Sequence, residues 1–223
     1  MVPPFIELTN LTKNFGNGKG IFDLSFGVQQ GEVFGFLGPN GAGKSTTIRH
    51  LMGFVKPQSG SCQIMGKDCF SQAALIQQSV GYLAGEIAFI EDMSGISYLN
   101  FIADMKGIRD RSSIRDLLYR FELNPRGKIK KMSKGMKQKI GLVAAFMGDP
   151  SVLILDEPTS GLDPLMQNRF VELLLERKKK GSTVFMSSHI FEEVEKTCNR
   201  TAIIREGRLV DIVQMKELSK LRN

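Results

Sequence analysis

The sequence lacks any apolar run near the roughly 20 residues that a helix needs to cross a bilayer. Its longest apolar stretches, residues 140–147 and 152–155, have only the length of core segments. The N-terminal stretch MVPPFIELTN has neither the basic start nor the apolar region of a secretory signal. Internal repeats and low-complexity tracts are also absent. Because 42% of the residues are hydrophobic, we expect residues 1–223 to form a single domain with a substantial core.

Cysteine is scarce as well. Cys62, Cys69 and Cys198 are odd in number and form no Cys-x-x-Cys pair. This pattern is not that of a disulfide framework. We expect three reduced, structural thiols in a protein of the cytosol.

Acidic residues are absent from residues 126–139, RGKIKKMSKGMKQK, a segment with seven basic residues. The whole chain has 30 Lys and Arg against 23 Asp and Glu, a formal net charge of +7, so the rest of the chain is neutral. A basic cluster suits nucleic acid, but composition alone does not decide what this one binds.

Hydrophobic periodicity predicts how the chain is organised. Strand patterns occupy residues 5–15, 21–28, 33–37, 61–65, 80–83, 151–156, 183–187, 201–205 and 208–213. Helical patterns occupy residues 45–52, 96–105, 114–121, 136–147, 164–180 and 190–198. Strands and helices alternate at both ends around a mostly helical middle. This order predicts an α/β core, residues 1–85 and 148–223, with a helical subdomain inserted at residues 86–147.

Residues 38–45, GPNGAGKS, match the phosphate-loop pattern G-x-x-x-x-G-K-[ST], with a predicted strand before and a helix after. Glycines let backbone N–H groups converge on a phosphate chain, and the start of the helix adds the positive end of its dipole. Lys44 would bridge the β- and γ-phosphates of a nucleotide, and the Ser45 hydroxyl would bind Mg²⁺. A chance match in a glycine-rich loop is the alternative. The loop residues that we predict to contact nucleotide are Gly38, Pro39, Asn40, Gly41, Ala42, Gly43, Lys44, Ser45 and Thr46.

Two acids end the apolar strand at residues 151–156. The strand would deliver Asp156 beside the phosphate loop, where it can hold Mg²⁺ through water. Glu157 is the next residue and suits a general base that polarises the attacking water. The alternative is a pair of solvated acids after an ordinary strand.

These motifs resemble those of the ATP-binding subunits of ABC transporters, and the likeness covers essentially the full length of the chain. Ser133 and Gly135 fall where that family has its signature motif, and the resemblance implies that they meet the γ-phosphate bound by an opposite subunit. Asp163 ends the family's D-loop, and His189 is its switch histidine, which we count with Glu157 and Lys44 as catalytic. The resemblance also places Phe15 on the adenine ring, although a core position would equally suit a phenylalanine.

The chain departs from the family pattern at two places. Lys134 and Met136 replace the first glycine and the glutamine of the signature motif. After residues 80–83 the family usually has glutamine, whereas this chain has Ala84-Gly85-Glu86. Glu86 is the nearest polar residue able to reach Mg²⁺, with the register open by one residue. The basic segment then becomes the approach to the signature helix, where positive charge suits ATP and anionic lipid headgroups.

The resemblance implies a P-loop nucleotide-hydrolase fold, with a mostly parallel sheet and an N-terminal antiparallel β part. It implies an ATPase that takes ATP and Mg²⁺, pairs with a second copy or a homologous subunit, and drives separate membrane subunits from the inner face of the cell membrane. The segments SKGMKQK and SSHIFEEVEKTCNR most resemble the ATPases paired with ABC-2-type exporters of antibiotics, lipids or peptides. A soluble ABC ATPase acting on nucleic acid or the ribosome is the alternative. Long coiled coils or a second cassette would mark that class, and neither is present.

Overall fold

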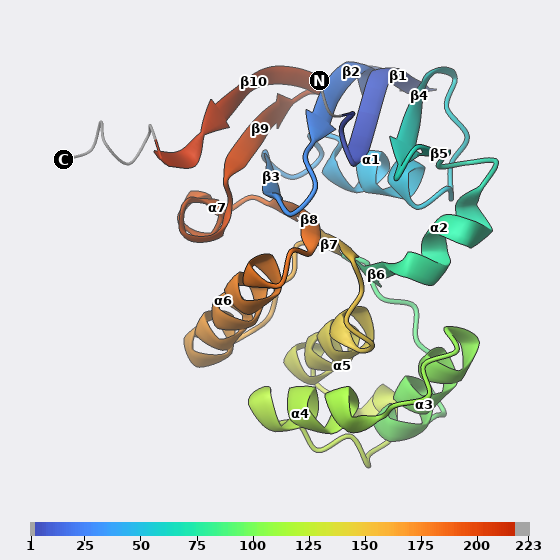
Figure 1. Cartoon of the computed structure of the whole chain (residues 1–223), viewed down its shortest axis with the longest axis vertical. Coiled ribbons are helices and arrows are strands. Elements are labelled where there is room, and N and C mark those ends of the chain that lie inside the picture. The colour runs from blue at the N-terminus through green and yellow to red at the C-terminus, as the bar shows by residue number, and fades with distance from the viewer. Residues whose placement is uncertain (1–2, 217–223) are drawn as a thin grey trace.

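The computed structural model describes residues 3–216, which form two β-sheets and a group of helices (Figure 1). The first sheet is antiparallel, in the order β2 (Lys19–Val28), β1 (Ile6–Gly16), β4 (Ser59–Ile64) and β5 (Lys67–Asp68). The second has the order β10 (Arg208–Gln214), β9 (Arg200–Arg205), β3 (Val33–Leu37), β8 (Thr183–Ser188), β7 (Val152–Asp156) and β6 (Val80–Leu83). Its strands are parallel except β10, which pairs antiparallel with β9. The predicted fold class is confirmed.

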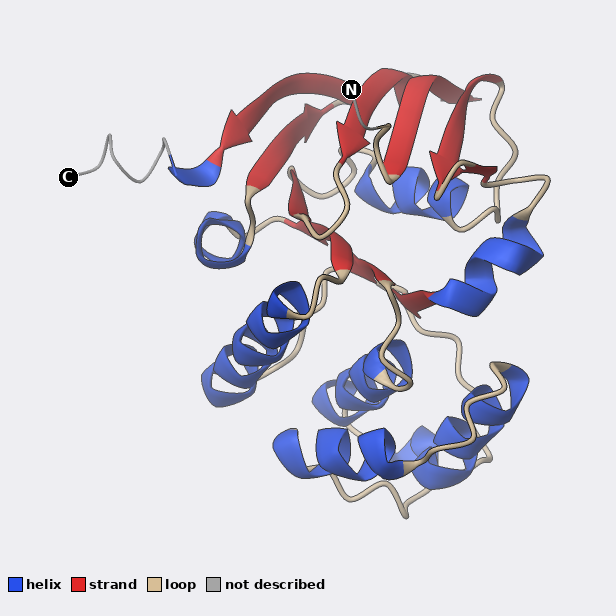
Figure 2. Ribbon diagram, in the orientation of Figure 1, coloured by secondary structure: helices blue, strands red, loops and turns tan. Residues whose placement is uncertain are grey.

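Helices pack against the second sheet. The helices are α1 (Lys44–Leu51), α2 (Ala73–Ser79), α3 (Gly95–Met105), α4 (Ser112–Arg120), α5 (Lys134–Phe146), α6 (Pro164–Lys179) and α7 (Phe191–Thr197), with a 3₁₀ turn η1 (Ile129–Lys131). In Figure 2 most strands gather at one end of the molecule, while α3, α4 and α5 gather at the other. None of the helices within residues 3–216 is both long and apolar enough to traverse a lipid bilayer.

The parallel strands are apolar because both of their faces are covered. All five residues of β7 are buried, as expected of a strand inside a parallel sheet. Along β3 the side chains alternate between two cores, since Val33 packs with the helices below and Phe34 packs with the antiparallel sheet above. Phe26 of β2 stacks on Phe34 with ring centroids 5.3 Å apart. This packing fixes the position of the C-terminal end of β3, and therefore the position of the loop that follows this strand.

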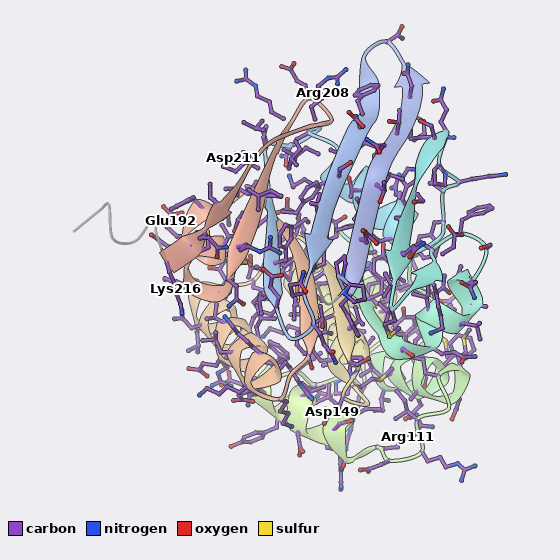
Figure 3. The ribbon with its side chains drawn as sticks, turned by 45° about the horizontal axis from the view of Figure 1, so that its top comes forward. Arg111, Asp149, Glu192, Arg208, Asp211 and Lys216 are labelled. Carbon is purple, nitrogen blue, oxygen red and sulfur yellow. The ribbon has the colours of Figure 1, made fainter. Side chains whose placement is uncertain are left out.

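The hairpin of β9 and β10 forms the outer edge of the second sheet. Figure 3 shows Arg208 and Asp211 along β10 at this edge. The hairpin was predicted, as were the helices of residues 96–147, with ends shifted by up to two residues. Strand β5, helix α2 and the turn η1 were not predicted. Helix α2 buries only Ile76, so its sequence carries almost no helical periodicity to detect.

Candidate active site

The phosphate loop connects β3 to α1 and depends on its glycines. Gly41 and Gly43 have φ values of +79° and +106°, in the left-handed region where glycine is favoured. A Cβ on Gly43 would lie 2.8 Å from Cγ2 of Ile21, and one on Gly38 would lie 2.4 Å from the carbonyl oxygen of Ile204. The glycines therefore allow both the tight turn and its close approach to the neighbouring strands.

Lys44 begins α1 and turns its ammonium group back across the loop. Its side chain is buried, and Nζ donates hydrogen bonds to the carbonyl oxygens of Gly38 at 2.7 Å and Pro39 at 3.1 Å. Nζ also lies 3.2 Å from Oε1 of Glu157. The loop thus presents one positive charge to an anion, and Glu157 balances it.

The acids at the end of β7 are aligned by the neighbouring strand. Because β7 and β8 are parallel with Asp156 opposite Ser187, the Ser187 hydroxyl can donate to Oδ1 of Asp156, at 2.5 Å. The backbone N–H of Glu157 donates to the same hydroxyl at 3.0 Å. Glu157 has a φ of +51°, a conformation that non-glycine residues adopt only where their surroundings hold them. Ser187, at the end of β8, stabilises this conformation through its hydrogen bond with the Glu157 N–H.

His189 completes the cluster around Glu157. Its Nδ1 lies 2.5 Å from Oε2 of Glu157, so one carboxyl group contacts both Lys44 and His189. The histidine side chain is 48% exposed, whereas that of Glu157 is 20% exposed. A water molecule or a phosphate arriving from solvent therefore meets these three groups together.

A second buried acid lies behind the histidine. The Ser188 hydroxyl donates to Oε2 of Glu193 at 2.6 Å, and the side chain of Glu193 is buried. Burial raises the pKa of Glu193, and the hydroxyls of Ser188 and Thr159 oppose that shift only in part. Through Ser188, Glu193 is tied to the turn that carries His189, and it is not among the residues that line the phosphate-loop cavity described below.

A cavity of about 610 Å³ adjoins the phosphate loop and contains most of the predicted nucleotide contacts. Phe15 lines its wall and is 57% exposed. The alternative of a core phenylalanine at this position is therefore wrong, and the ring is free to stack on a flat base. The other lining residues are Lys19, Gly20, Asn40, Gly41, Gly43, Lys44, Ser45, Thr46, Arg49 and Glu157.

A second cavity, of about 520 Å³, brings together the residues that we predicted for Mg²⁺: Ser45, Asp156 and Glu86 all line it. Hydroxyl and carboxylate oxygens are the ligands that Mg²⁺ prefers, so these residues fit that ion. Burial and the charge of Asp156 raise the pKa of Tyr82, on the same cavity wall, to about 12.

The structure also bears on the register of the glutamine-loop equivalent. A Cβ on Gly85 would lie 3.0 Å from Oδ2 of Asp156. Gly85 is therefore the residue that lies against the carboxylate that we predict to bind Mg²⁺, and Glu86 follows it in an exposed position. Glu86 as a ligand stays a prediction.

Ser133, Gly135 and Asp163 line neither of these two cavities. Ser133 is the N-cap of α5, where its hydroxyl accepts from the N–H of Met136, and Asp163 is the N-cap of α6. Their predicted contact with nucleotide therefore depends on a second subunit. Four residues that make hydrogen bonds around the predicted site were not predicted: Ser187, Ser188, Glu193 and Gln138.

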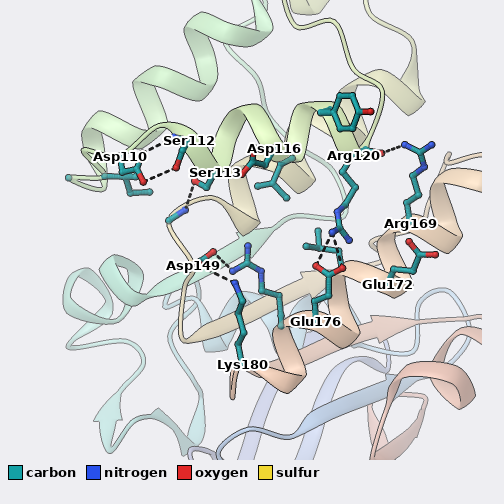
Figure 4. A pocket seen from close by; sticks show the side chains of 17 residues that line it. Asp110, Ser112, Ser113, Asp116, Arg120, Asp149, Arg169, Glu172, Glu176 and Lys180 are labelled. Atoms are coloured by element: carbon teal, nitrogen blue, oxygen red, sulfur yellow. Dashed lines mark hydrogen bonds and ion pairs between the residues drawn. The ribbon is translucent and has the colours of Figure 1, made fainter.

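The basic segment is partly neutralised in the fold. Nζ of Lys130 lies 2.6 Å from Asp92, and Nζ of Lys137 lies 3.9 Å from Glu91. A larger cavity, of about 1,170 Å³, lies elsewhere, between α4 and α6 (Figure 4). Ion pairs of Arg120 with Glu176 cross it, and it contains none of the predicted site residues.

Comparisons with known proteins agree with this geometry. A family model described as "ABC transporter" matches residues 21–160. The chain is 37% identical over 220 residues to the bacitracin transport ATP-binding protein BcrA of Bacillus licheniformis, a match that covers 96% of this chain and 71% of that protein. It is 36% identical to the linearmycin resistance ATP-binding protein LnrL of Bacillus subtilis, over 93% of this chain and 68% of that protein.

Solved structures show the same fold. An ATP-binding subunit of an ABC transporter superposes with a TM-score of 0.86 at 29% identity, covering 98% of this chain and 93% of that one. The dimeric bacterial ABC transporter cassette MJ0796 superposes with a TM-score of 0.84 at 20% identity, over 94% of this chain and 98% of that one.

Proposed function

The chain belongs to the ABC transporter family as an ATP-binding, ATP-hydrolysing subunit, and we propose that it works as the motor of an exporter. Two copies, or this chain and a homologous one, would enclose two ATP molecules and drive separate membrane subunits of the ABC-2 type from the inner face of the membrane. The observation that carries this proposal is that the carboxyl group of Glu157 contacts both Lys44 of the phosphate loop and His189.

Each of these residues has a distinct task in hydrolysis. The Glu157 carboxylate accepts a proton from the water that attacks the γ-phosphorus, so it acts as the general base. Lys44 holds phosphate oxygens and stabilises the charge that they carry in the transition state. His189 contacts the same carboxylate and orients it toward the attacking water. Mg²⁺, held by Ser45 and Asp156, would supply charge neutralisation on the phosphate oxygens.

In one chain the phosphate-loop cavity lacks the predicted signature residues Ser133 and Gly135, and their absence from it supports the proposed dimer. Ser133 is exposed at the start of α5 and has no part in its own chain's phosphate cavity. Free N–H groups at a helix start, together with a nearby hydroxyl, suit a phosphate that a partner subunit presents. The cargo is the finer part of the proposal. The names of a bacitracin transport protein and a linearmycin resistance protein among the relatives support an antibiotic, and a lipid or a peptide is proposed from the sequence resemblance alone.

We further propose that the loop after β6 contacts the membrane subunit. Ile90 is 49% exposed in this loop, whereas Phe89 is half-buried and packs edge-on against Tyr98. Phe54 is 55% exposed beside Tyr82 on the neighbouring cavity. Exposed apolar side chains with a polar surround are what a helix docked in a groove requires.

The mutation Ile90→Asp should weaken the complex with the membrane subunit by roughly tenfold or more, because it places a charge where an apolar contact is buried. Co-purification with the cognate membrane subunit measures the effect, and ATP binding should stay unchanged. Tyr119→Asp is the matched control, since Tyr119 is 87% exposed on α4 and outside this loop. Equal recovery of the complex with Ile90→Asp and with wild type would refute this contact surface.

A further inference from the structure

Helix α5 lies along the segment that carries the catalytic base, and Gln138 joins the two. Gln138 is only 5% exposed. Its Nε2 donates to the carbonyl oxygen of Pro158 at 2.9 Å and lies 3.3 Å from that of Glu157. A buried amide held between two carbonyl groups is fixed in position, because leaving either its donors or those acceptors unpaired is unfavourable.

The first turn of α5 also packs against the D-loop, at Gly161. A Cβ on Gly135 would lie 2.8 Å from the carbonyl oxygen of Gly161. The side chain of Lys134 packs against Gly161 from the other side, with its carbons 3.2–3.4 Å from where a Cβ would be. The first two turns of α5 therefore follow residues 157–161, so a shift of this helix is passed directly to that segment.

The backbone of Glu157 is held on both sides. Its N–H donates to the Ser187 hydroxyl, and its carbonyl faces the Gln138 amide. Between these contacts the residue has a φ of +51°, which needs support from its surroundings. The support on one side comes from β8, inside the core, and on the other side from α5, the helix whose N-cap is Ser133.

We propose that Gln138 is a positioning residue that couples the two nucleotide sites of the dimer, by relaying the position of α5 to the carboxyl group of Glu157. The inference rests on the proposed function, in which Ser133 at the start of α5 meets the γ-phosphate held by the partner. Engagement of that phosphate fixes α5, and the Gln138 amide then fixes the carbonyl groups of Glu157 and Pro158. The base is fully oriented only when the opposite site holds ATP.

The test compares variants that remove the amide while preserving side-chain size. Gln138→Met keeps the volume and loses both donors, and Gln138→Asn keeps the amide but is too short to reach both carbonyl groups. In each variant kcat for ATP hydrolysis should fall by roughly tenfold or more, the scale of lost hydrogen bonds that position a reacting group. The KM for ATP and the ATP-dependent dimer formed in a Glu157→Gln background should change by less than about twofold, because neither depends on the orientation of the base.

Gln167→Met is the matched control. Gln167 also donates from Nε2 to a loop carbonyl, that of Leu162 at 3.1 Å, but it comes from α6 and does not reach Glu157. Its kcat should stay within about twofold of wild type. Thermal unfolding of all variants shows the folded fraction to which each rate is normalised.

Three results would overturn the coupling role: wild-type kcat in either folded Gln138 variant, a parallel loss of kcat and ATP affinity, or an equal loss in Gln167→Met. Failure of the Glu157→Gln protein to dimerise with ATP would instead count against the proposed function, whatever the Gln138 variants do. The experiments therefore distinguish failure of the Gln138 coupling role from failure of the proposed function.

Discussion

Glu157→Gln is expected to lower the rate of ATP hydrolysis by at least about a hundredfold, the scale for loss of a general base. The amide keeps the size of the carboxyl group but cannot accept the proton of the attacking water. ATP binding should persist, because the phosphate loop and Lys44 are unchanged. A fluorescent nucleotide analogue measures binding, and release of inorganic phosphate measures turnover.

Glu192→Gln supplies the control for this experiment. Glu192 lies in the first turn of α7, beside Glu193, but its side chain is exposed and it lines neither nucleotide cavity (Figure 3). Its loss should leave turnover within about twofold of wild type, since exposed charges at this distance contribute little. Hydrolysis by Glu157→Gln at the wild-type rate would show that another group is the base.

Lys44→Ala should act on a different step and weaken ATP binding by about tenfold or more, because charge-assisted hydrogen bonds to the phosphates are lost. The substitution also leaves Glu157 without its nearest cation, at 3.2 Å in the structure. Lys44→Arg should not restore affinity, since the planar guanidinium does not fit a site built for a compact ammonium group between the Gly38 and Pro39 carbonyls. Titration with ATP by calorimetry measures both variants.

Lys196→Ala is the control for Lys44, because Lys196 is an exposed lysine of α7 outside the two nucleotide cavities. ATP affinity in this variant should equal that of wild type. Unchanged affinity in Lys44→Ala would contradict the assignment of the phosphate loop.

The parts of the fold that were predictable are those with strong local signals. Apolar runs before Gly38 and Asp156 identified the central strands, because parallel strands are buried on both faces. The glycines of the phosphate loop predict both a tight turn and a phosphate-binding function, so this one motif was enough to predict the position of the nucleotide site. Helix α2 and strand β5 had no such signal, since β5 has only two residues and α2 buries only Ile76, so neither shows a hydrophobic period. The division at residues 86–147 stays a prediction about domain boundaries.

The supporting residues of the site were harder to predict. Gln138 stands in a basic segment where a polar residue would ordinarily be exposed, and only the contact of α5 with residues 157–161 explains its burial. Ser187 looks like any strand residue until β8 is placed beside β7. Glu193 resembles a helix-surface acid until the Ser188 contact is seen. Their roles depend on tertiary pairing, which no local pattern records.

The central claim is that two chains enclose ATP between the phosphate loop of one and Ser133 of the other. Light scattering on the Glu157→Gln protein tests it most directly, because blocked hydrolysis should trap the closed form. Without nucleotide the mass should be that of one chain, 24.8 kDa, and with ATP it should be twice that value. Adding Ser133→Glu should return the mass to one chain, since its carboxylate would repel the partner's phosphate. A mass of one chain at saturating ATP, or a dimer that forms equally without ATP, would contradict the account.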